Sequence, residues 1–301
     1  MDIGLSVRAG DTGFTDIGLL TELAQALEAH GFASMWVPEH VVFFSEYRSK
    51  YPYHPEGKPP FGNDIGLFDP LLVFAALAQK TERLRFATSV MVLPERPALL
   101  TAKEVMTLDH LSRGRYELGV GAGWSEEEYA ALGVSFARRG KRFDEYIRAI
   151  RAAWHEDDAA FSGEFVSFEK VVLRPRPYTP GGPPFLIGGD SEAAMRRAAT
   201  LGDGWYSWWR GHDLEPHIET FRRVMAEHGR SFDGYRLKIG TPHRDEPAEA
   251  LQAKIERVRK VGATEMVLAV PIDPRHLERD IAFWAAAAGV SPPSARPAPG
   301  A

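Results

Sequence analysis

The sequence predicts an α/β fold, a (β/α)₈ TIM barrel with insertion loops at its carboxyl-terminal face. Short apolar runs alternate with helical stretches eight times along the 301 residues, which is the order of a closed parallel barrel. Several of these runs are apolar throughout, as in strands covered on both faces. The length suits one barrel of about 250 residues with added loops. An open, doubly wound sheet is the alternative.

The expected strands are rich in Val, Ile, Phe and Tyr, and they lie at Ile3–Val7, Ser34–Val37, Leu84–Leu93, Arg115–Gly121, Pro184–Gly188, Gly204–Ser207, Arg236–Gly240 and Glu265–Val270. The first expected helix carries an apolar stripe of Leu20, Leu23 and Leu27 and ends before Gly31, a common helix stop. The expected helices are Leu20–His30, Pro70–Gln79, Pro97–Leu111, Arg142–Trp154, Glu192–Leu201, His217–His228, Pro247–Val261 and Arg275–Ala288.

Three segments depart from this rhythm. Val41–Asp69 is long and aromatic and has no clean period, which is typical of a lid or binding loop; a dimer contact or disorder are the alternatives. Phe161–Arg176 is expected to form an extra hairpin. Residues 1–289 are therefore expected to form one domain, and the Pro/Ala/Gly-rich residues 290–301 a disordered tail.

Composition narrows the class of protein. The chain has 36 basic and 41 acidic residues, a net charge of −5, which argues against a nucleic-acid or anionic-membrane partner. It has no cysteine, which excludes disulfides, thiolate metal sites and a cysteine nucleophile. We expect a soluble cytoplasmic protein, because no secretion signal and no apolar stretch of about 20 residues is present.

His40 is the first candidate for chemistry. The active site of a barrel lies at the carboxyl ends of its strands, and the second expected strand runs into Pro38-Glu39-His40. An imidazole on this rim can donate or accept a proton near neutral pH. On spacing alone, a structural histidine that hydrogen-bonds at a strand end is the favoured interpretation.

Glycines mark two further strand ends. The fourth expected strand ends in Gly119-Val120-Gly121-Ala122-Gly123, which lets a flat ligand or a phosphate approach the backbone; plain packing is the alternative. The fifth ends in Gly188-Gly189-Asp190-Ser191 before a helix, and free amides at a helix start favour an anion. Asp190 or Ser191 would cap this helix in either case.

Other chemistries are poorly supported by the sequence. No metal site is expected, because the ten histidines are scattered and the chain has no HExxH motif. No Gly-x-Ser-x-Gly elbow of a hydrolase is present. Lys80, Lys103 and Lys260 fall on expected helices rather than strand ends, which argues against a Schiff-base aldolase.

Several stretches, in order along nearly the whole chain, match a known family. They are Gly31–His40, Leu84–Val90, Ala102–Arg115, Gly119–Trp124, Arg139–Tyr146, Ile187–Gly189 and Gly202–Trp205. On these residues the chain resembles the luciferase-like monooxygenase superfamily, and within it the branch that uses the deazaflavin coenzyme F420.

The resemblance implies a cofactor site across the barrel mouth. It implies that Thr88, Ser89, Val90, Gly121, Ala122 and Gly123 lie against the cofactor ring, with a non-proline cis peptide at Ser89–Val90. It also implies that Gly188, Gly189 and Asp190 hold the phosphate, and that Arg139 and Arg142 reach toward the cofactor. His40 matches a histidine beside the reactive carbon. A homodimer is a further expectation of the family.

One position departs from the family pattern. Some relatives that oxidise sugar phosphates or alcohols carry a glutamate at the strand-four end, where this chain has Ala122. This leaves His40 as the main proton-transfer candidate.

The leading hypothesis is hydride transfer between F420 and a small organic substrate, with Trp124, Tyr53 and Trp208 lining the pocket. An FMN-dependent monooxygenase that uses O₂ is the alternative, and a non-catalytic cofactor-binding protein is the alternative from another class.

Overall fold

The computed structural model describes residues 1–7, 15–59, 66–211, 213–243 and 246–292. Within them, eight parallel strand positions close into a barrel, with the order β3-β2-β1-β11-β10-β9-β8-β5-β4 and a β3–β5 pairing that closes the ring. The predicted TIM barrel is confirmed. The strands are β1 (Asp2–Ser6), β2 (Ser34–Val37), β3 (Arg85–Thr88), β4 (Met91–Val92), β5 (Tyr116–Gly121), β8 (Phe185–Gly188), β9 (Gly204–Trp208), β10 (Arg236–Pro242) and β11 (Glu265–Ala269).

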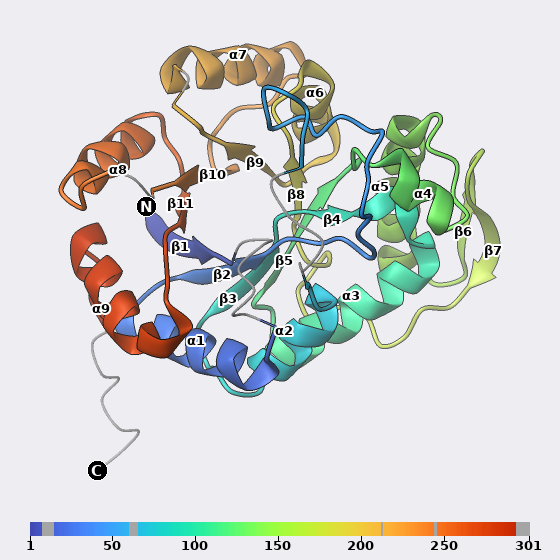
Figure 1. Ribbon diagram of the computed structural model, residues 1–301. Helices are drawn as coiled ribbons and strands as arrows, with labels where there is room; N and C mark the ends of the chain where they lie inside the picture. The colour runs from blue at the N-terminus through green and yellow to red at the C-terminus, as the bar shows by residue number, and fades with distance from the viewer. Residues whose placement is uncertain (8–14, 60–65, 212, 244–245, 293–301) are drawn as a thin grey trace.

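Helices form a ring around these strands (Figure 1). Asp16 caps the first helix, because its Oδ1 accepts a hydrogen bond of 2.9 Å from Leu19 N. Gly31, at φ 87°, ends that helix in the left-handed conformation, as predicted. The outer helices are α1 (Ile17–His30), α2 (Pro70–Ala78), α3 (Ala98–Ser112), α5 (Arg139–His155), α6 (Glu192–Leu201), α7 (Leu214–Glu227), α8 (Ala250–Lys260) and α9 (Leu277–Ala288).

Several elements differ from the sequence-based expectation, among them the third strand, α4 and α5. The single strand predicted at Leu84–Leu93 is wrong, because a cis peptide at Ser89–Val90 separates β3 from β4 and the 3₁₀ turn η2 (Leu93–Glu95) follows. Helix α4 (Glu126–Ala131) was not predicted, because six residues are too few for an apolar period. Helix α5 begins three residues before Arg142, in a polar first turn that carries no apolar signal. A short 3₁₀ turn, η3 (Pro274–His276), precedes α9.

Charged side chains fill the amino-terminal end of the barrel interior. Lys238 Nζ on β10 lies 2.6 Å from Glu265 Oε2 and 3.0 Å from Glu117 Oε2. Because β10 and β5 are not neighbours in the sheet, the contact with Glu117 crosses the interior. Burial opposes ionisation of Glu265, but Lys238 and Arg85 outweigh it and lower its pKa. The carboxyl ends of the strands lie at the opposite end of the barrel, where the loops follow them.

Two insertions interrupt the βα rhythm. Residues 41–59 and 66–69 contain no helix or strand, as predicted for the segment after β2. Residues 60–65 of that segment lie outside the described residues. The predicted hairpin is confirmed as an antiparallel pair, β6 (Ala159–Ser162) and β7 (Ser167–Val171). Of the predicted tail, residues 293–301 lie outside the described residues.

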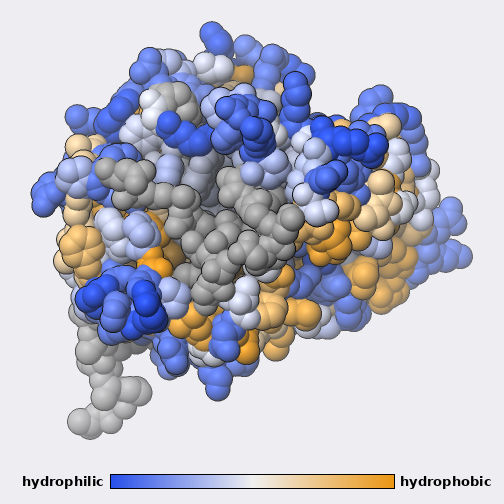
Figure 2. Space-filling view, viewed as in Figure 1, coloured by the Kyte–Doolittle hydropathy of each residue, from blue (hydrophilic) through white to orange (hydrophobic). Residues whose placement is uncertain are grey.

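Apolar side chains are exposed along α2 and α3. Leu72 on α2 is 74% exposed, and Leu100 and Leu111 on α3 are 54% and 41% exposed. Figure 2 shows hydrophobic residues gathered on this side of the molecule. Among the described residues, no helix has the length and apolar character needed to span a membrane.

Candidate active site

His40 and Glu128 form a hydrogen-bonded pair at the barrel rim. His40 Nδ1 lies 2.7 Å from Glu128 Oε2, and the other carboxylate oxygen accepts a 2.7 Å hydrogen bond from Val41 N. Glu128 is only 1% exposed. A buried carboxylate on Nδ1 fixes both the ring orientation and the nitrogen that carries the proton. This pair gives His40 the arrangement of an oriented general acid or base.

Helix α4 places Glu128 at this point. Ser125 Oγ accepts a 3.2 Å hydrogen bond from Glu128 N and so caps the helix. The Ser-x-x-Glu spacing of Ser125 and Glu128 is a readable helix-start signal. The sequence analysis did not identify Glu128. The structure adds a carboxylate from the next helix that contacts His40, while position 122 itself is an alanine.

The same helix anchors the insertion. Glu127 Oε1 accepts hydrogen bonds from Arg48 N at 2.6 Å and Ser49 N at 3.0 Å. Burial raises the pKa of Glu127, but hydrogen bonds from Ser49 and from the backbone together outweigh it and lower the pKa to about 2. Figure 1 shows this segment, in blue, running between the regions of α6 and α4. The insertion is therefore fastened beside the His40–Glu128 pair.

Aromatic rings surround His40. The Trp124 ring centroid lies 5.9 Å from that of His40, in a T-shaped arrangement. Tyr47 and Tyr51 of the insertion lie 5.2 Å and 5.1 Å from Trp124. Phe43 lies 5.3 Å from His40. The insertion thus contributes an apolar wall on this side of the rim.

The expected cis peptide at Ser89–Val90 is present, and Val90 lies between two predicted site glycines. A Cβ atom at Gly121 would lie 2.6 Å from Val90 Cγ2, and one at Gly188 would lie 2.5 Å from Val90 Cγ1. These contacts leave no room for a side chain at either glycine. Ser89 N donates to Val37 O at 2.9 Å, which ties this bulge to β2 three residues before His40.

Thr88 and Ser89 are anchored by their neighbours. Thr88 is fully buried, and its Oγ1 donates to Gly119 O at 2.6 Å. The Ser89 side chain hydrogen-bonds with Tyr206, whose ring stacks on Trp36 at 4.8 Å. Thr88 therefore supports the bulge from behind rather than facing its open side.

The end of β8 resolves which residue caps α6. Ser191 Oγ accepts from Ala194 N at 3.2 Å and is the cap. Asp190 Oδ1 instead accepts from Ser207 Oγ at 2.6 Å and lies 3.4 Å from His217 Nε2. Gly189 has φ 111°, which glycine adopts readily. The predicted phosphate loop therefore has its backbone turn and its carboxylate held from β9 and α7.

The two predicted arginines, Arg139 and Arg142, contact different parts of the structure. Arg139 Nε donates to Gly123 O at 3.3 Å, and its guanidinium lies 3.8 Å from the Phe136 ring centroid. Arg142 donates to Ser135 O at 2.6 Å and lies over Phe165, near the hairpin. The end of β5 therefore contacts Arg139 but not Arg142 through these bonds.

Tyr53 and Trp208 lie on the other side of the strand ends. Burial and the nearby Asp190 carboxylate raise the pKa of Tyr53 to about 12. The Arg210 guanidinium lies 4.9 Å from the Tyr53 ring centroid, and Trp208 lies 6.4 Å from Tyr206. The insertion thus reaches from Trp124, near β5, to the ends of β8 and β9.

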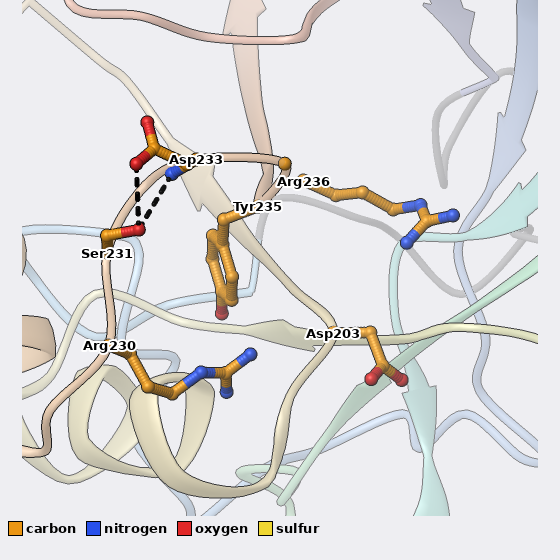
Figure 3. Close-up of a pocket in the computed structure, with 7 residues that line it drawn as sticks. Asp203, Arg230, Ser231, Asp233, Tyr235 and Arg236 are labelled. Atoms are coloured by element: carbon orange, nitrogen blue, oxygen red, sulfur yellow. Dashed lines mark hydrogen bonds between the residues drawn. The ribbon is translucent and has the colours of Figure 1, made fainter.

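A hollow of about 360 Å³ lies at the opposite, amino-terminal end of β9 and β10 (Figure 3). Arg230 in this hollow donates to Ala199 O and Gly202 O at 3.0 Å and 2.8 Å, and Arg236 pairs with Glu117 at 3.4 Å. These arginines serve the fold, and the predicted site residues lie at the other end of the barrel.

The family model for luciferase-like monooxygenases matches residues 4–291, and the chain belongs to this family. An uncharacterised protein of Mycobacterium tuberculosis is 39% identical over 218 residues, covering 72% of this chain and 75% of that protein. The FMNH(2)-dependent dimethylsulfone monooxygenase of Pseudomonas fluorescens is 30% identical over 187 residues, covering 60% of this chain and 50% of that enzyme.

A solved F420-dependent secondary alcohol dehydrogenase, in complex with an F420-acetone adduct, has the same fold. Its TM-score is 0.73 at 17% identity, over 95% of this chain and 98% of that chain. The family predicted from the sequence is thus confirmed, and the proteins similar to this chain include an F420-dependent enzyme of the same fold and an FMNH(2)-dependent monooxygenase of related sequence.

Proposed function

We propose that this protein is an oxidoreductase that transfers a hydride between coenzyme F420 and a small organic substrate, with His40 moving the matching proton. The observation that carries the proposal is the His40–Glu128 pair, placed on the rim next to the bulge at Ser89–Val90. The His40–Glu128 pair would hold a proton in a fixed orientation, and the bulge at Ser89–Val90 would form a backing for a flat ring.

The residues present fit such a cofactor. Val90 fills the space above Gly121 and Gly188, where side chains would otherwise project, so the three positions form a continuous backing. Gly121, Ala122 and Gly123 would lie along the ring, and Gly188, Gly189, Asp190 and Arg139 would hold its polar arm. When bound, the deazaflavin supplies a carbon that gives or takes a hydride.

The chain's own contribution is orientation and a proton. Glu128 accepts at Nδ1 of His40, so Nε2 is the nitrogen that exchanges a proton with the substrate. A positioned general acid or base contributes about 10²–10⁴-fold to a rate. Trp124 and the insertion would exclude water from the reacting atoms, which also orients the substrate.

Cofactor binding tests the proposal directly. The purified protein is titrated separately with F420 and with FMN, and binding is followed by fluorescence. We expect tight binding of F420, and turnover of its reduced form without oxygen uptake. Tight FMN binding with oxygen uptake, and no affinity for F420, would refute the proposal.

An FMN-dependent monooxygenase is the second candidate function. Its support is the 30% identity to the dimethylsulfone monooxygenase. A non-catalytic cofactor-binding protein is the third. The His40→Ala protein separates the third from the others, because it should bind cofactor normally and lose turnover. Unchanged turnover in His40→Ala would remove His40 from the mechanism.

We also propose a homodimer that buries exposed apolar residues on α2, on α3 and just before α2. Leu72, Leu100 and Phe68 are exposed by 74%, 54% and 44%, and apolar side chains in such numbers on one side are typical of an interface. Light scattering after gel filtration should give twice the 33.4 kDa chain mass. The Leu72→Glu protein should be smaller; a monomeric parent protein would refute the dimer.

A further inference from the structure

Glu95 is a buried carboxyl group with no role in the site described so far. It ends η2, directly after β4, and is 6% exposed. Its Oε2 atom is buried and makes no hydrogen bond within the described part of the chain. A buried charge without a hydrogen-bond partner is costly, and such a group takes up a proton instead.

The charged neighbours of Glu95 come from three elements. Glu128 and Tyr129 belong to α4, Glu39 follows β2, and Arg96 is the next residue in the chain. Arg96 donates from Nε to Glu39 Oε1 at 2.8 Å and also pairs with Asp69. The cation nearest to Glu95 is thus already shared by other carboxylates.

Helix α5, which packs against η2, carries the positive charges of Arg139 and Arg142. Arg139 and Arg142 act on the Tyr129 hydroxyl, which donates to Ala122 O at 2.7 Å. Burial, followed by the charges of Glu128 and Glu39, raises the pKa of Glu95 to about 9 against the influence of Arg96.

Glu128 has the opposite environment. It accepts hydrogen bonds from Val41 N and Val42 N and pairs with His40 Nδ1. Hydrogen bonds to a carboxylate favour its charged form. When two carboxyl groups lie close together, their environments decide which one holds the proton. Here both oxygens of Glu128 receive hydrogen bonds, whereas the buried Oε2 of Glu95 receives none within the described part of the chain.

We propose that Glu95 is a positioning residue, held as a neutral acid beside Glu128, which keeps a single negative charge on the His40–Glu128 pair. Only the negative charge of Glu128 then acts on His40 while it gives or takes a proton. Ionisation of Glu95 would add a second negative charge and raise the proton affinity of His40. The inference rests on the proposed function only for the role of His40 as proton carrier.

Carbon NMR of the protein without cofactor tests the protonation of Glu95. Glutamate is labelled with ¹³C at the carboxyl carbon, and the signal lost in Glu95→Gln is followed with pH. We expect it to titrate well above neutral pH in the parent protein. Titration near the ordinary value of 4.5 would overturn the proposal. If Glu95→Gln does not fold, Glu95→Met gives the same assignment.

Matched variants test the coupling to Glu128. Glu128→Gln removes the negative charge that acts most strongly on Glu95, so the Glu95 titration should move to lower pH. Glu127→Gln, on the same helix but bonded to Arg48 and Ser49, should leave it in place. Equal titrations in all three proteins would overturn the coupling.

The His40 ring provides the second readout. In Glu95→Gln the amide mimics the neutral acid, so the ring titration of His40 should match that of the parent protein. A downward shift of about one pH unit or more would mean that Glu95 is normally charged, and would overturn the proposal. Both titrations can be measured even if no turnover is found with any cofactor. A failure of the proposed function can therefore be told apart from a failure of this inference.

Discussion

The buried carboxylate of Glu128 binds His40 through one oxygen and the backbone of Val41 through the other, each at 2.7 Å. One side chain therefore fixes both the imidazole and the first peptide of the insertion. His40 follows β2 and Glu128 lies on α4, and the two residues are 88 positions apart in sequence.

Glu128→Gln should lower kcat by about 10²–10⁴-fold. The amide would present a donor or an acceptor to Nδ1 without the negative charge that stabilises the protonated ring. Glu127→Gln is the matched control and should retain kcat within a small factor, because Glu127 contacts only the insertion in these hydrogen bonds. Comparable losses in the two proteins would mean that Glu128 acts only by holding the loop.

Gly188→Ala should abolish cofactor binding while leaving the barrel folded. The new methyl group would lie 2.5 Å from Val90 Cγ1, so the Val90 side chain must move. Val90→Ala in the same chain removes that clash, and the double variant should recover binding. Fluorescence titration with F420 and FMN measures both proteins. Binding that is lost equally in the double variant would mean that Gly188 is needed for its backbone.

Arg96→Ala should lower the free energy of unfolding by about 3–5 kcal/mol, because it leaves a buried carboxylate unpaired. Glu39 is 4% exposed and receives two hydrogen bonds from this guanidinium. Arg196, which pairs on the surface with Glu192, provides the control, and Arg196→Ala should cost at most about 1 kcal/mol. Urea titration followed by circular dichroism compares them; similar losses would contradict the argument.

His243 should make the fold sensitive to mild acid. It is fully buried, and its Nδ1 lies 3.7 Å from Glu246 Oε2. Burial and Lys254 lower its pKa below the ordinary value of 6.5. The unfolded chain therefore takes up a proton first, and stability falls as pH drops below 6.5.

His243→Phe keeps a ring against Trp284, which lies 5.5 Å from the His243 centroid, and removes the titration. Its free energy of unfolding should depend less on pH between about pH 5 and pH 6.5 than that of the parent. Urea titrations across that range give both slopes, and identical slopes would contradict this account.

Most of the barrel could be predicted from the sequence, because parallel strands covered on both faces carry continuous apolar runs. The break in the third strand could not be predicted from its pattern. Val90, Met91 and Val92 continue the apolar run, and apolar pattern does not report peptide geometry. The resemblance placed the cis bond correctly where pattern could not.

The site was predicted in part. His40, Gly121 and Gly188 were named from strand ends and Val90 from the family resemblance, and the structure brings the last three into contact. Their roles toward a cofactor stay predictions. Glu128 was not predicted because it lies on a short helix beyond the strand end. Its contact with His40 depends on the path of α4 rather than on sequence spacing.

Helix α4 holds the insertion through Glu127 and the imidazole through Glu128, on adjacent residues. A substrate too bulky to fit under residues 41–49 would displace that segment. Because the segment is hydrogen-bonded to Glu127 and Glu128, the displacement would also shift the Glu128 carboxylate that orients His40. We therefore expect the enzyme to discriminate by size in the chemical step, with bulky compounds retaining their KM and losing kcat.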